Sequence, residues 1–135
     1  MRSARLLVLA STIALLAFSA SSTTALAASP PLIKALRATH VTEKSALLSA
    51  SIKPRGAETK YELWIDPCVP PMECITHVAM AQGTIPATAG KVTVSAATAV
   101  VFDELGLKPD ATYEYGVVAE SSEGRVEAQK TFTTR

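Results

Sequence analysis

Two cysteines and a histidine lie close together in the middle of the chain. Cys68 and Cys74 bracket a proline-containing segment, and His77 follows shortly afterwards. Thiolate and imidazole groups are zinc ligands, and Asp66 or Glu73 would add a carboxylate. The cysteine spacing is longer than in the usual zinc motifs, and it lacks the two-residue gap of redox-active dithiols. These residues therefore indicate a structural disulfide in preference to a metal or redox site, provided that the chain meets oxidising conditions.

Other residue types that could support catalysis do not form a recognisable constellation. His40 and His77 lie in unrelated places, and no GxSxG motif accompanies the serines. Asp103 and Glu104 are adjacent, so in extended chain their side chains point apart. There is no glycine-rich phosphate loop either. The sequence predicts a protein that is not an enzyme and that needs no cofactor or metal.

The N-terminal residues have the pattern of an export signal. Arg2 and Arg5 precede the uncharged apolar run Leu6 to Phe18, and Ala25-Leu26-Ala27 resembles a cleavage site. The apolar run is shorter than the roughly 20 residues that span a bilayer. We therefore expect a signal peptide at residues 1–27, a mature domain at residues 28–135, and a secreted, extracellular product. Oxidising conditions outside the cell then favour a Cys68–Cys74 disulfide.

The segment between the two cysteines has three interpretations. Closing so short a loop with a disulfide stabilises the fold by about 2 kcal/mol in the loop-closure model, so the loop is first a staple for a long connection. Alternatively, the prolines hold Val69 and Met72 outward as a rigid binding surface. A loop of this kind could also inhibit an extracellular enzyme as a mimic of a protease substrate.

Trp64 is the single tryptophan, and its position in an alternating segment leaves two alternatives. If Tyr61, Leu63 and Ile65 line the core, parity places Trp64 on the outer face of its sheet. An outward aromatic side chain is a candidate binding residue for sugar or protein. The other alternative is that Trp64 packs beneath the cysteine-bracketed loop, against Met72 or Val78.

The elements that must position these residues are strands. Tyr113, Tyr115, Val117 and Ala119 alternate with more polar residues, which is typical of a half-buried strand. The segments expected to form strands are 33–41, 45–53, 59–65, 78–81 and 92–102, followed by a pair within 105–134 joined by a hairpin at 121–124. Seven short strands without helical periodicity indicate an all-β, seven-stranded antiparallel β-sandwich.

The C-terminal segment resembles the last two strands of a fibronectin type III domain, an immunoglobulin-like fold. The matching positions are Leu105, Leu107, Pro109, Thr112, Tyr113, Tyr115, Val117, Ala119, Gly124 and Phe132 to Thr134. Weaker matches upstream extend the resemblance over residues 33–134, although Ile52 stands where family members often carry tryptophan. The resemblance implies a noncatalytic binding or spacing module. In it Tyr113 would form a structural tyrosine corner, its phenol bonded to upstream backbone.

Charge gives the last constraint on partners. Without Arg2 and Arg5, 11 basic residues stand against 12 acidic ones, a formal charge of −1. The charges are interspersed along the sequence without a basic stripe, so neither nucleic acid nor, after signal cleavage, a membrane is expected as partner. We expect a monomer that recognises an extracellular protein or polysaccharide.

Overall fold

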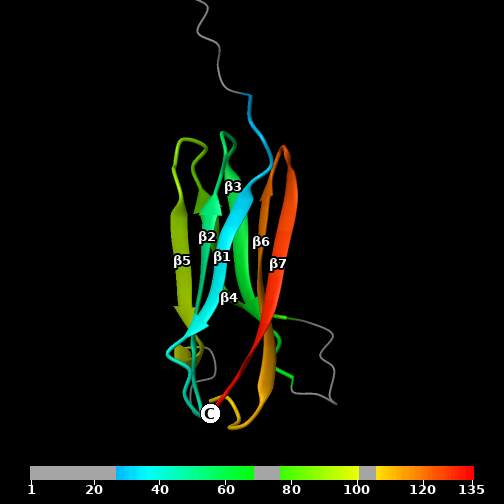
Figure 1. Ribbon diagram of the computed structural model, residues 1–135. Coiled ribbons are helices and arrows are strands. Elements are labelled where there is room, and N and C mark those ends of the chain that lie inside the picture. The colour runs from blue at the N-terminus through cyan, green and yellow to red at the C-terminus, as the bar shows by residue number, and fades with distance from the viewer. Residues whose placement is uncertain (1–26, 69–76, 101–105) are drawn as a thin grey trace, which may run out of the picture.

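The computed structural model describes residues 27–68, 77–100 and 106–135. Seven strands build two antiparallel sheets that pack face to face as a β-sandwich (Figure 1). The strands are β1 (Leu32–Thr39), β2 (Leu47–Lys53), β3 (Thr59–Ile65), β4 (Val78–Ile85), β5 (Val92–Ala97), β6 (Thr112–Ser121) and β7 (Gly124–Thr133), and a 3₁₀ turn, η1 (Thr98–Val100), follows β5. The predicted all-β sandwich is confirmed.

The order of the strands shows how the chain alternates between layers. One sheet has the order β1-β2-β5 and the other the order β4-β3-β6-β7. The chain therefore changes sheet after β2, after β4 and again after β5. Each change brings together strands that are distant in sequence, and the outer faces of both sheets are assembled in this way.

The core lies between the sheets and follows the alternation of the strands. On β6, Tyr113 and Tyr115 are almost wholly buried, and Val117 and Ala119 are completely buried. On the opposing sheet, Leu48, Ala50 and Ile52 are buried in the same way. Ile52 thus fills its part of the core without a tryptophan. Burial raises the pKa of the Tyr115 phenol above its usual value of 10.0, and a backbone hydrogen bond with Ala38 partly opposes this.

Two strands differ most in length from the prediction. β4 continues to Ile85 because that side chain is buried and its residue pairs with Thr59 of β3. β5 ends earlier than expected, at Ala97. The reason is Thr98, whose Oγ1 accepts the Ala46 N–H at 2.9 Å while its own N–H donates to the Ala46 carbonyl at 2.9 Å. A side chain replaces the backbone acceptor here, so the ladder between β2 and β5 stops.

Most of the predicted signal peptide lies outside the described residues. Within the part of the chain that the structure does describe, no helix is long and apolar enough to cross a membrane.

Candidate functional site

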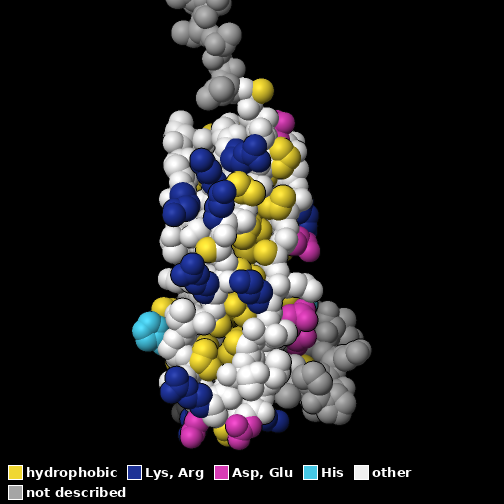
Figure 2. Space-filling model, in the orientation of Figure 1, with side chains coloured by type: hydrophobic (Ala, Val, Ile, Leu, Met, Phe, Trp, Pro, Cys, Tyr) yellow, Lys and Arg dark blue, Asp and Glu magenta, His cyan; other side chains and the backbone are white. Residues whose placement is uncertain are grey.

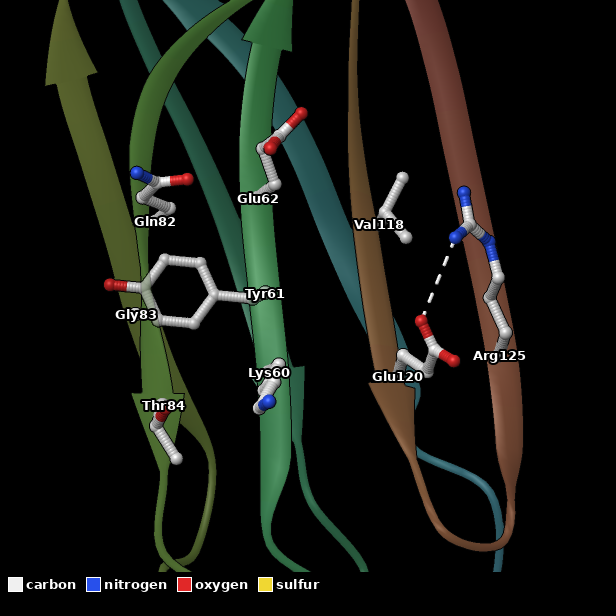
Figure 3. A pocket seen from close by; sticks show the side chains of 9 residues that line it. All are labelled: Lys60, Tyr61, Glu62, Gln82, Gly83, Thr84, Val118, Glu120 and Arg125. Atoms are coloured by element: carbon white, nitrogen blue, oxygen red, sulfur yellow. Dashed lines mark ion pairs between the residues drawn. The ribbon is translucent and has the colours of Figure 1, made fainter.

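The outer face of the four-stranded sheet carries a shallow hollow of about 420 Å³ (Figure 3). It lies over β3, β4, β6 and the start of β7. The residues that line it are Lys60, Tyr61, Glu62, Gln82, Gly83, Thr84, Val118, Glu120 and Arg125. A second, adjoining hollow shares Lys60 and Glu120 and extends to the β6–β7 turn. Volumes of this size are in the range of small-ligand sites.

Strand register explains why these side chains gather. Lys60 of β3 pairs with Thr84 on one side and Glu120 on the other, and Glu120 pairs with Arg125. The next residue of β3 on the same face is Glu62, which pairs with Gln82 of β4 and with Val118 of β6. Directly opposed side chains on one face of a sheet lie about 5 Å apart. The hollow is thus two cross-strand rows of polar groups, with Val118 as its apolar floor.

Ion pairs hold one end of the hollow. Arg125 Nη2 lies 2.6 Å from Glu127 Oε1, and Arg125 Nη1 lies 3.6 Å from Glu120 Oε2. The hydrogen bond to Glu127, followed by the charges of Glu127 and Glu120, raises the pKa of the guanidinium further above its already high value. All three side chains are more than half exposed, so these pairs add little to stability. Their effect is to fix the relative positions of the donors and acceptors at this end of the hollow.

A glycine lies at the β4 edge of the hollow, and it and Tyr61 occupy strand positions that face the core. The ring of Tyr61 lies against Gly83, its partner on β4, and Figure 3 shows the ring crossing that strand. A Cβ at position 83 would lie 3.0 Å from Tyr61 Oη and 3.1 Å from Tyr61 Cε1. The absence of a side chain at Gly83 therefore makes room for the phenol at the sheet edge.

The lining residues suit binding better than covalent chemistry. Glu62 and Glu120 are diagonal neighbours on adjacent strands, a relation that corresponds to about 7–8 Å between Cα atoms. Both lie on an open sheet face in contact with water, and Glu120 is paired with Arg125. A hydrated surface of this kind screens charge and does not enclose a substrate. Its hydroxyl, amide, carboxylate and cationic groups can form many directional hydrogen bonds with one polar molecule.

Trp64 does not provide the open aromatic surface that one interpretation of the sequence proposed. Parity is as expected, since Trp64 lies on the outer face opposite Gly116, but the side chain is only 6% exposed. Its indole lies over Gly116, and the His77 ring packs against it with centroids 3.7 Å apart and the ring planes tilted by 48°. Trp64 is therefore a packed residue.

The cysteine-bracketed loop lies largely outside the described residues. Val69, Met72 and Cys74 belong to that part, so the Cys68–Cys74 disulfide and the three roles suggested for the loop stay predictions. Of the described residues, Asp66 Oδ1 accepts the Cys68 N–H at 2.9 Å, which shapes the start of the loop. Nor do three or more His, Cys, Asp or Glu residues gather for metal binding anywhere in the described ranges.

Tyr113 makes a contact of the kind that a tyrosine corner requires. Its phenolic oxygen accepts a hydrogen bond of 2.9 Å from the Lys108 N–H, five residues upstream. The ring is buried and stacks against Phe132 of β7, with centroids 5.8 Å apart. Both interactions are structural and lie on the core side of the sheet, away from the hollow.

Most residues of the hollow were not identified from the sequence as a site. Lys60, Glu62, Gln82 and Glu120 occupy polar positions of three different strands. The alternation of polar and apolar residues predicts that each of these side chains faces solvent. Only the pairing of β3 with β4 and β6 brings them together. Their signal in the sequence is the same as that of any solvated strand face.

Comparison with known proteins gives structural neighbours only. The chain matches no protein-family model and no curated protein. Among solved structures, it is similar to the sensor domain of the anti-sigma factor RsgI4 from Pseudobacteroides cellulosolvens. A short form of that domain aligns with a TM-score of 0.52 and 18% identity over 80% of this chain and 97% of that one. A long form aligns with a TM-score of 0.50 and 20% identity over 77% and 88%. At these identities the similarity establishes a shared β-sandwich fold.

Proposed function

We propose that this protein is a secreted, monomeric, noncatalytic recognition module of the fibronectin type III kind that binds an extracellular polysaccharide. The observation that carries the proposal is the hollow on the outer face of the four-stranded sheet. It gathers hydrogen-bonding groups from three strands and the start of a fourth on a rigid, solvent-accessible surface.

The composition of the hollow favours a neutral sugar polymer over a protein surface. Two cations, Lys60 and Arg125, balance two carboxylates, Glu62 and Glu120, so the lining carries no net charge. Protein interfaces depend on buried aromatic and aliphatic anchors at their centre. Here the outward apolar side chain is a single valine, Val118, and apart from Tyr61 at the β4 edge the side chains around it are polar. Sugar hydroxyls both donate and accept, which is what such a mixed lining can satisfy.

Further observations support the family and the compartment. Two features fit a fibronectin type III sandwich. They are the strand order, β1-β2-β5 in one sheet and β4-β3-β6-β7 in the other, and the Tyr113 hydrogen bond. The basic and apolar N-terminal pattern that ends at Ala27 fits export. The RsgI4 domain is named as a sensor, a noncatalytic role that agrees with the one proposed here.

The experiment is a nuclear magnetic resonance titration of the purified protein with soluble cello-, xylo-, manno- and chito-oligosaccharides. At least one series should shift the amide signals of residues such as Lys60, Gln82 and Val118. Changing Glu62→Gln together with Gln82→Ala should abolish these shifts. Gln129→Ala is the matched control, because Gln129 is exposed on the same face but does not line the hollow.

Three outcomes would refute the proposal. The first is that no oligosaccharide series shifts the hollow residues. The second is that the shifts fall on other surfaces and persist in the double variant. The third is product formation, detected by chromatography after prolonged incubation, which would contradict the noncatalytic part.

A further inference from the structure

The outer face of the three-stranded sheet differs in charge from that of the four-stranded sheet. Strands β1, β2 and β5 contain Lys34, Arg37 and Lys53 but no Asp or Glu, and Lys91 immediately precedes β5. The strands of the other sheet contain four glutamates: Glu62, Glu114, Glu120 and Glu127. In Figure 2, Lys and Arg side chains gather over the visible face, whereas Asp and Glu lie around its rim.

Register places these cations on one surface. Arg37 pairs with Ser49, which pairs with Ser95, so the three share the outer face. Lys53 lies four residues beyond Ser49 on the same strand and face, about 13 Å away along the strand. Lys34 is exposed at the irregularity between Ile33 and Ala35 of β1. The cations are therefore spread over the length of the sheet and not concentrated at one point.

Two of these lysines face each other. Ile52 pairs with Val92, and continuing the register by one residue places Lys53 opposite Lys91. Both are exposed, and among the described residues no carboxylate lies within ion-pair distance of them or of Arg37. Directly opposed like charges destabilise a sheet. A face that combines this repulsion with an absence of counter-charges is suited to an external polyanion.

On β2 and β5, the groups between the cations are small hydroxyls, while Leu32 and Ala35 of β1 lie beside them. Ser49 and Ser51 of β2 lie beside Ser95 and Thr93 of β5 on the outer face, and Ser51 Oγ lies 3.3 Å from Thr93 Oγ1. Small side chains keep the surface flat, so an extended molecule can lie across it. Hydroxyls can exchange hydrogen bonds with the hydroxyls of a sugar chain.

We propose that this surface, the outer face of β1, β2 and β5 with Lys91, binds an acidic polysaccharide as a site separate from the hollow. Carboxylates on successive sugars would pair with Lys34, Arg37, Lys53 and Lys91, and sugar hydroxyls would contact the serine and threonine side chains. The spacing of the cations requires a ligand with several anionic groups on one extended chain.

Two other polyanionic partners fit the surface less well. Sequence-independent binding of single-stranded nucleic acid uses aromatic side chains as stacking platforms, and β1, β2 and β5 contain no aromatic residue. Binding to a membrane surface uses large apolar side chains between the cations. On β2 and β5 those places hold Ser49, Ser51, Thr93 and Ser95, and Leu32 on β1 is half-buried.

The test is calorimetric titration of the purified protein with soluble polygalacturonate, which carries a carboxylate on each sugar, and with its fully methyl-esterified, uncharged form. Only the acidic polymer should bind, and its affinity should fall as salt is raised from about 0.05 to about 0.5 M, because exposed charges are screened. The variant Arg37→Gln, Lys53→Gln, Lys91→Gln should lose about tenfold in affinity.

A matched control removes the same charge elsewhere. Lys44→Gln, Lys108→Gln, Arg135→Gln changes three exposed cations outside the strands and should leave binding intact. Equal loss of affinity in both triple variants would overturn the proposal in favour of a net-charge effect. Binding of the methyl ester as tightly as the acid would overturn it too. Tighter binding of polyuridylate, or of vesicles containing phosphatidylglycerol, would show that the occupant is not a polysaccharide. Variants of the hollow should not affect this titration, so the two proposals fail independently.

Discussion

The contact between Trp64 and Gly116 makes the packing of the outer face testable. A methyl group added at position 116 would lie 2.5 Å from Trp64 Cζ2 and 2.6 Å from the Ala128 carbonyl oxygen. Both distances are far inside van der Waals contact. The carbonyl belongs to β7, whose backbone is held by pairing with β6, so the indole must move if the methyl group is to fit.

The size of the effect follows from three contributions to the free energy of unfolding. Overpacking of a well-filled site costs about 1–3 kcal/mol. Partial exposure of the indole adds on the order of 1 kcal/mol. Replacing glycine restricts the unfolded chain and offsets about 0.4–1 kcal/mol. The expected result for Gly116→Ala is a net destabilisation of about 2 kcal/mol, which lowers the melting temperature by roughly 10 °C for a domain of this size.

Thermal unfolding followed by circular dichroism measures the loss, and fluorescence reports its cause. Because Trp64 is the single tryptophan, a red shift of the native emission in Gly116→Ala would show that the indole has been displaced. Gly90→Ala is the control, since a Cβ there meets nothing within 4 Å. If Gly116→Ala has the same melting temperature as the wild-type protein and the same emission maximum, Trp64 does not pack on Gly116 as described.

Three further outcomes test the core. Tyr113→Phe leaves the Lys108 N–H without its acceptor and should cost about 1–2 kcal/mol in urea unfolding; equal stability would remove the tyrosine-corner role. Thr98→Val takes the acceptor from the buried Ala46 N–H and should cost about 1–3 kcal/mol by the same measurement, and a smaller effect would mean that water replaces the hydroxyl. The raised pKa of Tyr115 means that the unfolded chain loses this proton first, so its contribution to stability is complete below about pH 10 and is lost as the pH rises through the folded-state pKa. Urea midpoints between pH 8 and 11 should therefore fall less steeply in Tyr115→Phe, and an identical slope would contradict the assignment.

The fold could be predicted because it depends on local patterns. Tyr113, Tyr115, Val117 and Ala119 alternate on β6, and all four are buried as expected. Parity also placed Trp64 on the correct face of β3. Alternation along a strand predicts which face a side chain lies on, but not how exposed it is. Exposure depends on the residues of the neighbouring strands that pack against it. Gly116 is an unremarkable residue in the sequence, yet its missing side chain is what allows the indole to lie flat and become buried.

The end of β5 was mispredicted for a similar reason. The sequence from Val92 onward is rich in β-forming residues, and local propensity alone extends the strand. Thr98 ends it through a side-chain hydrogen bond with Ala46, a residue 52 positions earlier. Ladder hydrogen bonds are satisfied by whatever partner the fold supplies. No local pattern can anticipate a partner at that distance.

Charge shows most clearly what the sequence could not reveal. Along the chain, acidic and basic residues are interspersed, and that order argued against a polyanionic partner. The chain then lays β1 and β2 in one sheet, β3 and β4 in the other, returns to the first with β5, and completes the second with β6 and β7. This alternation sorts the charges, because the strands of the first sheet carry only cations while the glutamates fall on the second. Net charge is close to zero for the whole molecule, but the outer face of the first sheet is cationic, and binding responds to the field of a face. Two surfaces of different character, one balanced and one cationic, are consequently available to two chemically different partners on a single small domain.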